Sequence, residues 1–114
     1  MALMDRLRID GKVAIVTGAG RGVGRGIALA LAEGGATVVC SARTRSEIDD
    51  TVREITGNGG RALAITADVM QESELRALVD ATLRECDRLD IVINNAGGND
   101  YKPFLDISAE EFRH

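Results

Sequence analysis

The sequence predicts an α/β fold in which a doubly wound parallel sheet lies between two layers of helices. Two observations lead to this prediction. Short β-branched apolar runs alternate with segments whose apolar residues recur every three to four positions, and glycines separate many of these segments. No internal repeat or low-complexity stretch interrupts the alternation. Strands joined by helical crossovers form a parallel sheet, and we expect the strand order 3-2-1-4.

The first strand is predicted at residues 12–17, KVAIVT, where a β-branched run ends in glycines. A helix should begin near Val23, because apolar residues then follow at helical spacing, and it should stop at the glycine pair 34–35. Residues 36–42, ATVVCSA, are typical of a second buried strand.

The second half of the chain repeats the alternation. Thr44 and Glu47 fit a capping box at the start of the second helix, which should end at the GNGG segment 57–60. The third strand, the third helix and the fourth strand are then predicted at residues 61–68, 72–87 and 89–95.

Composition limits the class of protein. The chain has 114 residues with 45% hydrophobic content, which suits one small packed domain or a part of one. A net charge of −4, 3% aromatic residues and no basic run argue against a nucleic-acid partner. The N-terminal residues mix charges before any long apolar run, so neither a signal peptide nor a membrane partner is expected. The prediction is a soluble protein that handles small molecules.

The two cysteines, Cys40 and Cys86, lack C-x-x-C spacing. We expect idle thiols, no metal site and a cytoplasmic location, because reduced cysteines suit the cytoplasm.

Four strand ends should meet at one edge of the sheet, where doubly wound folds bind their ligands. The segments there are TGAGRGVG at 17–24, SARTR at 41–45, ADV at 67–69 and NNAGG at 94–98. The glycines allow a tight turn that brings the backbone, and the N-terminus of the following helix, close to a pyrophosphate. The loop does not contain G-x-G-x-x-G, because position 23 is a valine, and no Gly-Lys-Ser/Thr follows to make a P-loop.

The loop TGAGRGVG resembles the T-G-x-x-x-G-x-G loop of the short-chain dehydrogenase/reductase family, and NNAG at 94–97 resembles that family's second motif. Asp68 and Val69 are similar to its adenine-contacting pair. The resemblance implies an incomplete Rossmann-type sheet, a three-layer αβα arrangement, that binds a nicotinamide dinucleotide. It assigns the phosphate and ribose site to Gly18, Arg21, Gly22, Val23 and Gly24, the adenine site to Asp68 and Val69, and the nicotinamide ribose site to Asn95, Ala96 and Gly97.

The end of the second strand indicates which cofactor is used. Ser41 and Arg43 are further candidates for cofactor binding there, and Ala42 stands where NAD enzymes of this resemblance place an acid. An acid at this point binds the ribose hydroxyls of NAD, whereas an arginine accommodates the extra phosphate of NADP. With Arg43 and Arg21 near this point, we favour NADP(H) over NAD(H), which remains possible.

No catalytic residue is predicted within the chain. The resemblance implies a catalytic serine, and a tyrosine with a lysine four positions later, but the single tyrosine, Tyr101, is followed at that spacing by Leu105. A capping box at Ser108–Glu111 indicates that a further helix begins near the last residue. We therefore interpret residues 1–114 as the N-terminal, cofactor-binding part of one domain, inactive alone, with the catalytic half elsewhere.

The complete protein is expected to transfer hydride between nicotinamide and a small carbonyl or alcohol substrate. In the 114-residue chain alone, the predicted fourth strand would be an uncovered apolar edge of the sheet. We therefore expect this chain to associate with a second fragment or to form a homo-oligomer. Two alternatives remain open at this point: a non-catalytic nucleotide-binding module, and a fragment of an adenosyl-methionine-dependent methyltransferase.

Overall fold

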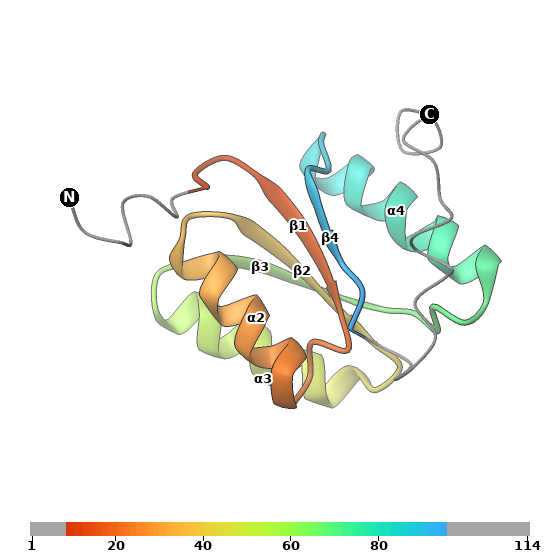
Figure 1. Ribbon diagram of the computed structural model, residues 1–114, viewed down its shortest axis with the longest axis horizontal. Coiled ribbons are helices and arrows are strands. Elements are labelled where there is room, and N and C mark those ends of the chain that lie inside the picture. The colour runs from red at the N-terminus through yellow and green to blue at the C-terminus, as the bar shows by residue number, and fades with distance from the viewer. Residues whose placement is uncertain (1–8, 96–114) are drawn as a thin grey trace.

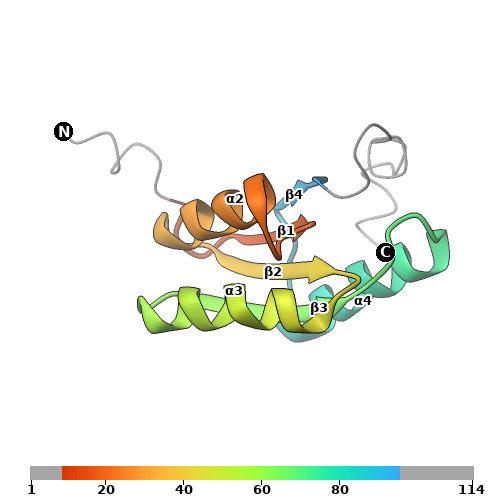
Figure 2. The same ribbon diagram turned by 90° about the horizontal axis from the view of Figure 1, so that it is seen from below.

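A computed structural model describes residues 9–95 of the chain. Strands and helices alternate in the order β1 (Val13–Thr17), α2 (Gly22–Glu33), β2 (Thr37–Ala42), α3 (Arg45–Gly57), β3 (Arg61–Thr66), α4 (Glu72–Cys86) and β4 (Ile91–Ile93). The four strands form one parallel sheet in the order β3-β2-β1-β4, and the arrows of β1, β2 and β4 point the same way in Figure 2. The predicted fold class and strand order are confirmed.

Helices cover both faces of the sheet. Figure 1 shows α2 and α3 on one side and α4 on the other. Successive residues of β2 alternate between these sides: Val38 and Cys40 belong to the apolar cluster under α2 and α3, and Val39 belongs to the cluster under α4. Because both faces are covered, the central strands are mostly apolar, which is why they appear in the sequence as short hydrophobic runs rather than as alternating patterns.

The centre of the sheet is fully buried. Ile15 and Val16 in β1, and Val38 and Val39 in β2, have no exposed surface. Burial of one such side chain contributes about 1.5–3 kcal/mol relative to leaving it in water. The sheet is therefore stabilised mainly at β1 and β2, the two strands whose ends carry the candidate binding loops.

The element boundaries differ from the predictions by a few residues at most, as at β4, which is shorter than predicted. One local prediction is wrong. Thr44 is the N-cap of α3, but its side chain makes no capping hydrogen bond, so the predicted capping box does not form. The Glu47 side chain instead packs against Gly20 in the loop after β1. The second capping box, at Ser108–Glu111, lies outside the described residues.

Among residues 9–95, none of the helices is long and apolar enough to cross a membrane. Within the same range, β4 pairs with β1 on one side only, and Ile91 to Ile93 are half-buried. Association through this edge stays a prediction.

A carboxylate fixes the start of β4 against β1. Asp90 Oδ2 accepts a hydrogen bond from the Val13 backbone N–H at 2.9 Å, and the Asp90 N–H donates to the Val13 carbonyl, also at 2.9 Å. Arg88 donates from Nε and Nη2 to the two carboxylate oxygens, each at 2.8 Å. The hydrogen bond from Arg88 lowers the pKa of Asp90, and the Val13 N–H lowers it further. The ionised carboxylate is thus the form that the fold favours.

This pKa shift predicts a pH-dependent contribution to stability. Because the folded pKa of Asp90 is lowered, its contribution is present above the ordinary pKa of aspartate and is lost as the pH falls through the folded pKa. Near neutral pH, Asp90→Asn should lower the free energy of unfolding of the full-length protein by about 1 kcal/mol. The difference from wild type should shrink as the pH falls below the ordinary pKa of aspartate and through the lowered folded pKa, as measured by urea unfolding across a pH series.

Asp50→Asn is the matched control, because Asp50 pairs with Arg53 on the exposed surface of α3. It should change stability by less than about 0.5 kcal/mol. A deficit in Asp90→Asn that is the same at every pH would contradict the assignment.

Candidate functional site

A cleft lies at the edge of the sheet where the parallel strands end. Thr17 at the end of β1 is in register with Ser41 in β2, and Ala42 is in register with Thr66 in β3. The cleft has a volume of about 350 Å³. Its lining residues come from all four strand ends and from the start of α3: Thr17, Gly18, Gly20, Arg21, Ser41, Ala42, Arg43, Thr44, Glu47, Ala67, Asp68, Val69, Met70 and Asn95.

The glycines of the loop after β1 serve different purposes. Gly18 and Gly22 have φ values of +64° and +60°, which side chains other than glycine adopt rarely. Gly24 lies in the first turn of α2 and is buried, and here the requirement for glycine comes from close packing. A Cβ at this position would lie 2.1 Å from the Gly18 carbonyl oxygen and 2.5 Å from Nδ2 of Asn95. The absence of a side chain at Gly24 thus lets α2 begin directly against the loop and against the end of β4.

Thr17 joins the ends of β1 and β4. Its side chain is fully buried, and its Oγ1 accepts a hydrogen bond from the Asn95 N–H at 2.9 Å. The same oxygen lies 3.1 Å from Oδ1 of Asn94 and 3.4 Å from the carbonyl oxygen of Ile93, and both are acceptors for its hydroxyl proton. Sequence reasoning assigned Thr17 no such role, although a polar residue at the end of an apolar run was a signal.

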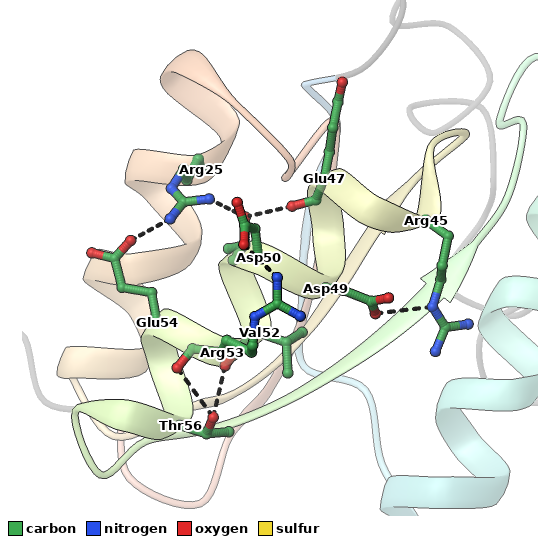
Figure 3. Close-up of polar contacts among 10 residues, drawn as sticks. Arg25, Arg45, Glu47, Asp49, Asp50, Val52, Arg53, Glu54 and Thr56 are labelled. Atoms are coloured by element: carbon green, nitrogen blue, oxygen red, sulfur yellow. Dashed lines mark hydrogen bonds and ion pairs between the residues drawn. The ribbon is translucent and has the colours of Figure 1, made fainter.

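Thr51 of α3 holds the glycine loop from the other side. The side chain is fully buried, and its Oγ1 donates to the carbonyl oxygen of Ala19 at 2.9 Å. Arg25 of α2 donates from Nη1 to this hydroxyl at 3.1 Å, and its Nη2 pairs with Glu54 (Figure 3). Helix α3 is therefore tied both to the loop and to α2. The sequence signal was a threonine on the apolar face of the predicted helix, three positions after Ile48.

The loops after β1, β2 and β3 bring two arginines and one acid to the cleft. Arg21 and Arg43 are exposed, and neither side chain makes a hydrogen bond or an ion pair within residues 9–95. Asp68 is partly committed to its own turn, because Oδ1 accepts from the Met70 N–H at 3.0 Å. Its N–H donates to Oε1 of Glu74 at 2.8 Å. The two arginines are thus available to an anion.

Ser41 is fully buried at the end of β2. Its carbonyl oxygen accepts the Ala19 N–H at 3.2 Å, which gives the glycine loop a second tie to the sheet. Its Oγ has no hydrogen-bond partner in the described part of the chain. Because this oxygen is inaccessible to solvent, a ligand in the cleft would meet other atoms of Ser41 unless the side chain rotates.

The structure brings most of the predicted cofactor-binding residues to this cleft. Those that line it are Gly18, Arg21, Ser41, Arg43, Asp68, Val69 and Asn95. Gly22, Val23 and Gly24 lie beside it in the first turn of α2, with Val23 70% exposed. Ala96 and Gly97 lie outside the described residues, as does Tyr101. Glu47 and Met70 line the cleft although sequence reasoning did not select them.

The cleft can hold an anion and orient a ligand. Arg21 is the N-cap of α2 and makes no side-chain capping bond, so the N–H groups of the first turn face the loop without a side-chain acceptor from their cap. The lining residues include no tyrosine, lysine or histidine among those described. No group of three metal-ligating side chains occurs within residues 9–95.

Neither cysteine contributes chemistry to the cleft. Burial raises the pKa of the Cys40 thiol to about 12, and nearby Arg25 offsets this only partly. Burial also raises the pKa of Cys86. Both thiols are free and stay protonated near neutral pH.

Residues 12–114 match the family model for short chain dehydrogenase. The 7alpha-hydroxysteroid dehydrogenase of Escherichia coli K12 is 45% identical over 109 residues, which are 96% of this chain and 42% of that protein. The chain therefore spans less than half the length of this relative.

Solved structures agree with the sequence comparison. A 7 alpha-hydroxysteroid dehydrogenase complexed with NADH and 7-oxo glycochenodeoxycholic acid has a TM-score of 0.81 and 44% identity, with 99% of this chain and 44% of that chain covered. The Pseudomonas aeruginosa RhlG/NADP active-site complex has a TM-score of 0.74 and 40% identity, with 80% and 36% covered.

Two glycines of α2 allow a test of the close packing at the cleft. Gly24→Ala should lower the free energy of unfolding of the full-length protein by about 1–3 kcal/mol, because the added Cβ would overlap the Gly18 carbonyl. Gly26→Ala is the control, since a Cβ there meets nothing within 4 Å, and it should raise stability by about 0.5–1 kcal/mol. Urea unfolding measures both, and equal stability of the two variants would refute the packing argument.

Proposed function

This chain belongs to the short-chain dehydrogenase family, and on that premise we propose that it forms the cofactor-binding part of an NADP(H)-dependent oxidoreductase. The observation that supports this most is the cleft itself. It combines the glycine loop, the end of β2 and the Asp68–Val69 pair at one edge of a parallel sheet. Doubly wound sheets bind dinucleotides at this edge.

The residues present fit such a cofactor. Gly18 has a positive φ, and Gly24 packs directly against the Gly18 carbonyl and Asn95, so the chain turns tightly there and α2 begins directly after the loop. The first-turn N–H groups of α2 would donate to the oxygens of the pyrophosphate. A cleft of about 350 Å³ is at the lower end of ligand-pocket volumes, as expected if it takes the adenosine part of the dinucleotide.

Each predicted residue then has a place in the proposal. Val69, which is buried, and Asp68 would contact the adenine ring, while Asn95 would lie near the nicotinamide ribose. Thr17 positions Asn95 through the hydrogen bond to its N–H. We propose that the first turn of α2 contributes Gly22, Val23 and Gly24 around the phosphates, and that Ala96 and Gly97 continue the nicotinamide end.

A bound nicotinamide would donate a hydride to the carbon of a carbonyl substrate when reduced, or accept one from the carbon of an alcohol when oxidised. The described residues bind and orient this cofactor, and we place the proton-transferring tyrosine, its lysine and the serine in a further part of the protein. The proposed setting is a cytoplasmic homo-oligomer. Family membership argues against the methyltransferase alternative.

The charges at the end of β2 support the preference for NADP(H). Ala42 leaves no carboxylate at the last residue of β2, and Arg43 follows directly. Arg43 and Arg21 line the same cleft from two different loops. An arginine pairs well with phosphate through its planar group of donors. Similar structures hold NADH in one case and NADP in another, so family membership alone does not choose between them.

Arg43→Ala tests the preference. In the full-length protein, it should weaken NADPH binding about tenfold and leave NADH binding nearly unchanged, because only NADPH carries the phosphate. Dissociation constants from fluorescence titration give the result. Arg45→Ala is the matched control, since Arg45 pairs with Asp49 and does not line the cleft, and it should change neither constant. An unchanged NADPH to NADH ratio in Arg43→Ala would sink the assignment.

A further inference from the structure

One glycine of the loop is explained neither by the family spacing nor by backbone conformation. The T-G-x-x-x-G-x-G pattern requires Gly18, Gly22 and Gly24 but leaves Gly20 unassigned. Gly20 is not among the residues with positive φ. A Cβ at Gly20 would lie 2.5 Å from Cβ of Glu47 and 3.0 Å from its Oε1. The bare backbone at this position therefore makes room for the side chain of Glu47.

Thr51 lies between the backbone of Glu47 and the loop after β1. Glu47 lies in the first turn of α3, and Thr51 Oγ1, one turn later, lies 3.4 Å from the Glu47 carbonyl oxygen. The same hydroxyl donates to Ala19, the residue before Gly20. One buried hydroxyl thus connects the turn that carries Glu47 to the loop that accommodates it. Figure 3 shows the Glu47 side chain directed away from the Arg25–Glu54 pair.

The Glu47 carboxylate lines the same cleft as the two arginines. Within residues 9–95 it has no hydrogen bond or ion pair. Asp68, the other acid of the cleft, has one carboxylate oxygen in a hydrogen bond to its own turn. Glu47 is therefore the acid there whose two carboxylate oxygens have no hydrogen-bond partner among the described residues.

We propose that Glu47 is a specificity-determining residue for the cofactor. Its carboxylate accepts hydrogen bonds from the adenosine ribose hydroxyls of NAD(H) and repels the 2′-phosphate of NADP(H). It thereby supplies, from the start of α3, the acid that Ala42 does not supply from the end of β2. Arg21 and Arg43 act in the opposite direction, so the cleft balances two cofactors. This inference rests on the proposed function.

The sign of the effect follows from charge. Two like charges about 4 Å apart oppose each other by about 1 kcal/mol in water, and by more at a protein surface. Removing the charge of Glu47 therefore favours the phosphorylated cofactor. Removing it also takes one strong acceptor from the ribose hydroxyls, which disfavours the other cofactor.

Glu47→Gln in the full-length protein tests the inference, because it keeps the shape and removes the charge. NADPH should bind about three- to tenfold more tightly, and NADH about three- to tenfold more weakly, by fluorescence titration. Asp50→Asn is the control: it makes the same charge change on the same helix, but Asp50 is exposed, pairs with Arg53 and does not line the cleft. Neither dissociation constant should change in this variant.

Two further measurements test whether the effect on cofactor binding comes from the charge of Glu47. One excludes an effect at the nicotinamide end, and the other excludes an effect of packing. Adenosine 2′,5′-bisphosphate, which lacks nicotinamide, should also bind more tightly to Glu47→Gln. Glu47→Asp retains the charge, so its ratio of NADPH to NADH affinity should stay closer to wild type than that of Glu47→Gln.

The inference is overturned if this affinity ratio is unchanged or shifts toward NADH in Glu47→Gln. It is also overturned if the ratio shifts equally in both variants. If Arg43→Ala still shifts the ratio in that case, the proposed NADP(H) preference stands and only the role of Glu47 is lost.

Discussion

The buried hydroxyl of Thr17 is the contact on which the geometry of the cleft depends. Strands β1 and β4 are neighbours in space, but β4 is short and its ladder with β1 ends at Ile93. Beyond that point the hydroxyl of Thr17 continues the connection, because it accepts the Asn95 N–H. Asn95 is then close enough for its side-chain amide to face the start of α2 at Gly24. The loop after β1, helix α2 and the end of β4 are thus connected through the polar contacts of Thr17 and Asn95.

The loop is restrained on its other flank by hydrogen bonds from β2 and α3. The Ala19 N–H donates to the Ser41 carbonyl and the Ala19 carbonyl accepts from Thr51, so both backbone polar groups of this residue are paired. A loop restrained at both ends loses little further freedom when it binds a ligand, and preorganisation of this kind increases affinity. The backbone of the loop is therefore shaped by its hydrogen bonds to β2 and α3.

The sequence predicted the fold well because each element had a strong local signal. Both faces of the sheet are covered, so the central strands are mostly apolar, and the glycines mark where several of the strands end. The sequence also predicted which loops meet, since parallel strands end at one edge. It did not predict that Thr44 would leave its helix uncapped while Glu47 turned toward Gly20. A capping-box pattern is local, whereas the packing of Glu47 depends on a loop more than 20 residues earlier in the chain. Thr17 and Thr51 were missed for the same reason, because their partners lie 78 and 32 residues away.

The contact between Asp90 and Val13 has a consequence for the entropy of assembling the cleft. Val13 pairs with Thr37 in β2 across a short crossover, but its contact with Asp90 spans 77 residues, about three times as many. Closing the longer loop costs about 1 kcal/mol more in chain entropy. The side of the cleft formed by β4 and Asn95 is therefore the part whose assembly costs the most loop-closure entropy. The hydrogen bonds of Arg88, Asp90 and Val13 lie at the base of that side, where they offset this cost directly.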